Sequence, residues 1–101
     1  MARLNETEKL IQHAAKRLTP LDAKAFDKLI EFYDDLNYLH GGNDLEVINI
    51  LYCTDHNVIP FEIIAGNLGT SVSRLEHKRK DFQKIFLRHY EQLKRQEPAA
   101  A

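Results

Sequence analysis

The chain has 101 residues, 44% of them hydrophobic, which suits one small domain with a single core. Its one cysteine, Cys53, excludes an internal disulfide and a cysteine-based zinc site, and we expect neither a metal nor another cofactor. Since we find neither a membrane-spanning stretch nor a secretion signal, we expect a cytoplasmic protein with no membrane partner.

Charge is distributed unevenly along the chain, although the formal net charge is only −1. Residues 1–59 contain six Lys/Arg and ten Asp/Glu, whereas residues 60–101 contain eight Lys/Arg and five Asp/Glu. A basic second half is what contact with phosphates would require. Lys and Arg are also favoured near the C-terminal end of any helix, so the pattern alone leaves both interpretations open.

Two helices are predicted at the start of the chain. Residues 4–18 have apolar side chains at helical spacing, with Asn5 as a plausible N-cap and Glu8 placed to complete a capping box. Thr19, followed by a proline, predicts a second helix over residues 20–39, because Thr caps well and Pro fits the first helical position.

A third helix is predicted over residues 45–53, although its β-branched residues would also suit a strand. Gly41 is expected to end the second helix in a left-handed conformation. Asn43 is then a candidate cap, with Glu46 at the third helical position. The side chains expected to face inward are Ile48, Leu51 and Tyr52.

The clearest local motif spans residues 60–75, which read as a short helix, a glycine turn and the start of a long helix over 72–96. Ala65 would let the two helices approach closely. Gly69 would take a positive φ that other residues resist, and Ser71 would cap the second helix. The apolar residues that would hold the motif against the preceding helix are Leu68 and Leu75.

On these residues, the run from 45 to 86 is similar in layout to the helix-turn-helix of sigma factor region 4 and related bacterial and phage regulators. It departs from that pattern at Thr70, Lys78 and Arg79, where apolar residues are usual. The resemblance implies an all-α fold of about five helices. A tri-helical helix-turn-helix core, with the motif at about 60–80, would follow an N-terminal helical pair and include a long C-terminal helix.

We expect residues 1–97 to form a single domain, and residues 98–101 to form a disordered tail. The resemblance implies duplex DNA as the partner of the long helix. Positions near its start would enter a groove, and Lys78, Arg79 and Lys84 would more naturally meet phosphates. The complete set of candidate DNA-binding residues is Ser71, Ser73, Arg74, His77, Lys78, Arg79, Lys80 and Lys84.

The second half of the long helix carries an apolar stripe at helical spacing. Exposed, a stripe of this size would promote aggregation, so it must pack against the N-terminal helices or against a second copy. We expect both contacts, with part of the stripe on the N-terminal helices and part on a second copy, because a homodimer would present two recognition helices. The stripe consists of Phe82, Ile85, Phe86, Tyr90 and Leu93.

The sequence therefore favours a small transcriptional regulator that binds DNA as a homodimer, with RNA polymerase or another regulatory protein as a possible further partner. The alternative is a protein-binding helical module, such as an anti-sigma factor, an antiactivator or an assembly adaptor. Glu76 at a groove position and the long apolar stripe favour that alternative. We do not expect an enzyme, because we find no convergent acid, nucleophile or phosphate loop.

Overall fold

A computed structural model of the chain describes residues 4–53 and 60–96. These residues contain helices and no strands, which confirms the predicted all-α class with about five helices. The predicted tail over residues 98–101 lies outside the described residues. The elements are α1 (Glu6–Ala14), α2 (Pro20–His40), α3 (Asp44–Ile48), the π-helical segment η1 (Asn49–Cys53) that continues it, α4 (Phe61–Asn67) and α5 (Val72–Gln96).

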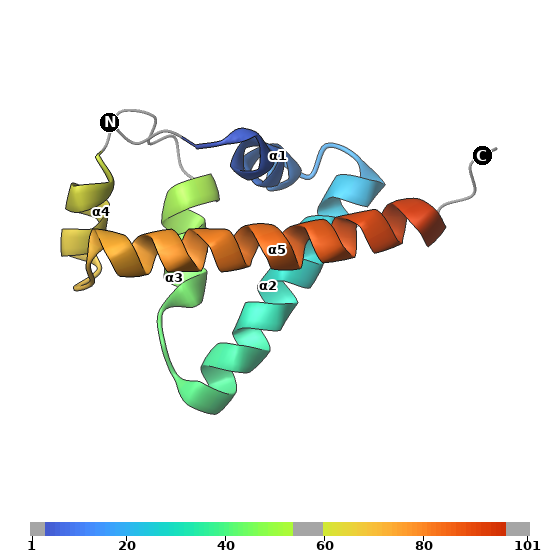
Figure 1. Ribbon diagram of the computed structural model, residues 1–101. Helices are drawn as coiled ribbons and strands as arrows, with labels where there is room; N and C mark the ends of the chain where they lie inside the picture. The colour runs from blue at the N-terminus through green and yellow to red at the C-terminus, as the bar shows by residue number, and fades with distance from the viewer. Residues whose placement is uncertain (1–3, 54–59, 97–101) are drawn as a thin grey trace.

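The long helix α5 is the element on which the others assemble (Figure 1). Helices α1, α2 and α4 all pack against it, and α3 with η1 packs against α1 and α2. In Figure 1, α2 crosses α5 obliquely, and α4 stands across its N-terminal end. The buried side chains at the centre of the core include Ile11, Leu29, Ile48, Leu75, Phe82 and Phe86.

The predicted starts of the first two helices are confirmed. At α1, the Glu8 backbone N–H donates to Asn5 Oδ1 at 2.9 Å, and the Asn5 N–H donates to Glu8 Oε1 at 3.2 Å. At α2, Thr19 Oγ1 accepts from the Asp22 N–H at 3.1 Å, and Pro20 takes the first helical position. These caps satisfy amide groups that have no partner inside a helix.

Helix α1 ends at Ala14, so the prediction that it reaches residue 18 was wrong. Its last turn tightens, because the Arg17 N–H donates to the Ala14 carbonyl at 2.9 Å, and Arg17 then takes a left-handed φ of 57°. Thr19 is extended, as the residue before a proline prefers to be. The chain must therefore leave the helix before Thr19, which leaves Leu18 exposed.

The third helix begins as predicted but differs in two details. Asn43 has a ψ of 27°, outside the extended region that an N-cap needs, and its side chain makes no capping bond. The capping predicted for Asn43 was therefore wrong. The helix also widens into the π-helical η1 after Ile48. The inward positions are confirmed, because Ile48, Leu51 and Tyr52 are all buried.

A buried carboxylate, that of Glu8, connects three separate parts of the chain. Its Oε2 accepts from the Tyr52 hydroxyl at 2.9 Å and from Arg79 Nε at 2.8 Å. Its Oε1 accepts from Arg79 Nη2 and from the Asn5 N–H. Four donors therefore satisfy the two oxygens of a fully buried charge, as such a group requires.

Arg79 extends the same network to α4. Its guanidinium lies over the Phe61 ring, 4.1 Å from the ring centroid, in a cation–π contact. Burial acts to lower the pKa of Arg79, but hydrogen bonds to Glu8 and its charge outweigh burial and raise the pKa above its usual value. Burial and the neighbouring Glu8 also raise the pKa of Tyr52, so its hydroxyl remains a donor.

A second ion pair joins α5 to the start of α3. Lys78 Nζ bonds to Asp44 Oδ1, and the side chain of Asp44 is largely buried. Lys78 and Arg79 therefore lie on the inward side of α5, where the helix-turn-helix pattern usually has apolar residues. Each charge there is paired with a carboxylate from the first half of the chain.

We predict that Glu8→Ala lowers the free energy of unfolding by about 3–5 kcal/mol, because it removes the buried carboxylate that pairs with Arg79 and accepts from the Tyr52 hydroxyl. Urea unfolding followed by circular dichroism measures this loss. The control is Asp27→Asn, which breaks the exposed pair with Arg17 and should be close to neutral. A Glu8→Ala variant as stable as the control would contradict the structural role of this network.

Candidate nucleic-acid interface

A tight turn centred on Gly69 connects α4 to α5. Gly69 has a φ of 68°, and its N–H donates to the Gly66 carbonyl at 3.1 Å. The Thr70 N–H donates to the Ala65 carbonyl at 2.9 Å. This pair of bonds is the Schellman arrangement, in which a left-handed glycine closes a helix. The predicted conformation of Gly69 is thus confirmed.

Helix α5 starts at Val72, three residues after that glycine. Ser71 Oγ accepts from the Arg74 N–H at 3.2 Å, which is the predicted cap. Ala65 and Leu75 are both buried, and Leu68 is half-buried against the same core. The short turn between a closed helix and a capped one fixes the direction in which α5 leaves α4, and Figure 1 shows the two crossing.

One exposed row of side chains runs along the outer side of α5. Ser73, His77, Lys80 and Lys84 follow one another at helical spacing and are all exposed. Arg74 is exposed beside this row, and so is the capping residue Ser71. Five of the eight candidate DNA-binding residues therefore lie on one accessible side of the helix, and Ser71 caps its start.

The other two candidates, Lys78 and Arg79, lie elsewhere. The side chain of Arg79 is only 13% exposed, and its guanidinium bonds to Glu8. Lys78 is half-buried against Asp44. Both positive charges are engaged within the chain, so we assign Lys78 and Arg79 to internal ion pairs and leave them out of the interface.

Sequence reasoning missed one member of the exposed row. Arg88 is exposed and follows Lys84 by four residues, so it continues the row by one turn. That spacing was the signal that could have identified it. Two exposed carboxylates, Glu76 and Asp81, lie on the same part of α5 and reduce its positive charge.

The predicted apolar stripe of α5 packs inside the molecule. Phe82 and Phe86 are fully buried, and Phe82 meets the Tyr33 ring of α2 edge to face, with centroids 4.9 Å apart. The other members, Ile85, Tyr90 and Leu93, are half-buried against the same core. Packing thus accounts for the stripe, while its use in a homodimer stays a prediction.

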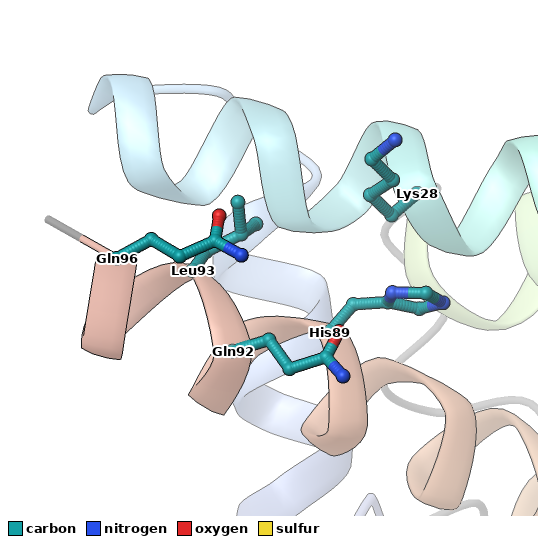
Figure 2. A pocket seen from close by; sticks show the side chains of 5 residues that line it. All are labelled: Lys28, His89, Gln92, Leu93 and Gln96. Atoms are coloured by element: carbon teal, nitrogen blue, oxygen red, sulfur yellow. The ribbon is translucent and has the colours of Figure 1, made fainter.

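A shallow cavity of about 300 Å³ lies between α2 and the C-terminal end of α5. Figure 2 shows that Lys28 comes from α2 and that the other four lining residues come from successive turns of α5. Burial and the charges of Lys28 and Arg88 lower the pKa of His89 in this lining. The lining residues are Lys28, His89, Gln92, Leu93 and Gln96.

The described residues contain no group of three or more His, Cys, Asp or Glu side chains that could hold a metal ion. None of the described helices is long and apolar enough to cross a membrane. Comparisons with protein-family models, curated proteins and solved structures gave no match to this chain.

We predict opposite effects of alanine at two glycines of the turn region. Gly69→Ala should destabilise the protein by about 1–2 kcal/mol, because its φ is left-handed. Gly66→Ala is the matched control and should stabilise it by about 0.5–1 kcal/mol, since Gly66 is helical. A new Cβ has open space at both positions, so backbone conformation is the only difference. Thermal and urea unfolding measure both; equal effects would refute this account of the turn.

We also predict that Lys28→Gln raises the pKa of His89 toward its ordinary value, because it removes one of the positive charges that lower it. Burial, the largest cause of the lowered pKa, would remain, so the return should be partial. An NMR titration of the imidazole measures the change. Lys24→Gln, one turn earlier on α2, is the control and should leave the His89 pKa where it is.

Proposed function

We propose that the chain is a cytoplasmic, DNA-binding transcriptional regulator that places the outer side of α5 against duplex DNA. The observation that carries this proposal is the exposed row Ser73, His77, Lys80 and Lys84 on a helix whose start is fixed by a Schellman turn and a serine cap. The major groove of B-DNA, about 12 Å wide, admits one α-helix.

The roles of the residues follow from their positions along α5. Arg74, in the first turn, would contact guanine or a phosphate. Lys80, Lys84 and Arg88 lie progressively farther along the helix and would meet backbone phosphates, which position a protein without reading sequence. From residue 73 to residue 88 the row is roughly 22 Å long at 1.5 Å per residue.

The proposal includes a homodimer. One exposed α5 offers four cationic side chains between residues 73 and 88, partly offset by Glu76 and Asp81. So few phosphate contacts give weak binding at physiological salt, because each contact releases few counterions from the DNA and therefore adds little to the binding free energy. Two copies would double the contacts and read two half-sites about 34–36 Å apart.

The second candidate function is the protein-binding helical module. The observation that favours it is a cluster of exposed apolar side chains at the C-terminal half of α2, well away in sequence from α5. A surface of this kind is typical of protein contact rather than of DNA contact. The two functions use different residues, so one chain can carry both.

We predict that Arg74→Ala combined with Lys80→Ala lowers the affinity for random duplex DNA about ten-fold at low salt. The slope of log K against log salt should also become shallower by about 1.8, or 0.9 for each lost phosphate contact. Fluorescence anisotropy with a labelled duplex over a salt series measures both quantities.

The matched control is Lys9→Ala combined with Lys24→Ala, which removes the same charge from exposed positions on α1 and α2. This control should keep the affinity and the salt slope near those of the wild type. If the two double variants bind equally, the interface assigned to α5 is wrong. If the wild type does not bind duplex DNA even at low salt, the protein-binding function replaces the DNA-binding one.

A further inference from the structure

The C-terminal half of α2 exposes an unusual amount of apolar surface. Tyr38 is 89% exposed, Leu39 71% and Phe32 40%. Only two other large hydrophobic side chains among the described residues, Leu18 and Ile63, are as accessible, and each lies on a different part of the chain. Figure 1 shows that this half of α2 extends beyond its crossing with α5.

Two of these side chains share one side of the helix, and the third lies beside it. Phe32 and Leu39 are seven residues apart, so they lie on one side of α2, with half-buried Leu36 between them. Tyr38 lies about 100° further round the helix, with exposed Asp35 between it and Leu39. Phe32 is held in place by an edge-to-face contact with Tyr33, with ring centroids 5.0 Å apart. The surface is therefore preorganised on a helix that is anchored in the core.

Acidic residues accompany this apolar surface. Asp35 lies one turn before both Tyr38 and Leu39, and Asp34 lies one turn before Tyr38. Neither carboxylate is within ion-pair distance of a basic side chain of the described residues. Glu31, on the same side as Tyr38, is 3.6 Å from Lys28. The surface is thus apolar with an excess of negative charge.

The negative charge of this surface distinguishes between two candidate partners, a second copy of this chain and a basic protein. In a two-fold contact between copies the same surface faces itself, so two surfaces with an excess of negative charge would be opposed, which is unfavourable. A basic partner would instead pair with Asp34 and Asp35. The described part of this chain has no strand edge on which a partner could add a strand, whereas an amphipathic helix can lay its apolar face on an exposed helix surface of this kind.

We propose that residues 31–40 of α2 form a docking surface for a basic amphipathic α-helix of another protein. The apolar side of that helix would cover Phe32, Tyr38 and Leu39, and its Lys or Arg side chains would meet Asp34 and Asp35. The proposal does not depend on DNA binding, because none of these residues belongs to the exposed row of α5.

The test uses a synthetic amphipathic peptide of Leu and Lys, with leucines at i, i+3, i+4 and i+7, labelled for fluorescence anisotropy. The wild type should bind it, and Tyr38→Ser combined with Leu39→Ser should weaken binding about ten-fold or more. Asp34→Asn with Asp35→Asn should weaken binding less, and mainly at low salt. These side chains are exposed, so the variants should keep the fold, which circular dichroism verifies.

Leu18→Ser combined with Ile63→Ser is the matched control, since it removes two exposed apolar side chains from other places and should bind like the wild type. Amide shifts on peptide binding should centre on residues 31–40. The proposal is overturned if the wild type does not bind, if the Tyr38/Leu39 variant binds equally, or if a peptide with Glu in place of Lys binds as well. Light scattering that finds a dimer abolished by Tyr38→Ser and Leu39→Ser would assign the surface to a second copy instead.

Discussion

The arrangement of the helices depends on one buried charge, the Glu8 carboxylate. A buried carboxylate is tolerated only when donors surround it, and here they come from the cap of α1, from η1 and from α5. Arg79 carries the connection to α4 through the Phe61 ring. Because Arg79 meets Glu8 on the inward side of α5, this contact and the buried Phe82 and Phe86 together favour the rotation of α5 in which its basic row faces outward.

This pairing changes the meaning of the uneven charge along the sequence. The basic second half and the acidic first half partly neutralise each other inside the fold, through Arg79 with Glu8 and Lys78 with Asp44. Charges paired in this way are poorly placed to attract phosphate. The positive charge that α5 offers to a partner is therefore smaller than its composition implies, and it is concentrated at Arg74, Lys80, Lys84 and Arg88.

Sequence reasoning succeeded where a local pattern decides the structure. Asn5 with Glu8, Thr19 and Ser71 cap as predicted, because their partners lie three residues away. It failed at Asn43, whose ψ of 27° lies outside the extended region that an N-cap needs. It also could not identify the partner of Arg79, since Glu8 is 71 residues away and only the complete fold brings the two together. An arginine at an apolar position of the pattern was nevertheless a visible sign that a buried carboxylate was needed.

The two outer surfaces of the chain have opposite character, and this has a consequence for how they would act together. The row on α5 is basic and polar, whereas the end of α2 is acidic and apolar. Phosphates attract the first and repel the second, so a duplex would favour the row on α5 over the end of α2. Because both helices pack against one core, a partner on α2 would be held at a fixed position relative to that duplex. Such an arrangement would place a second protein beside a DNA site without requiring a change of conformation in this chain.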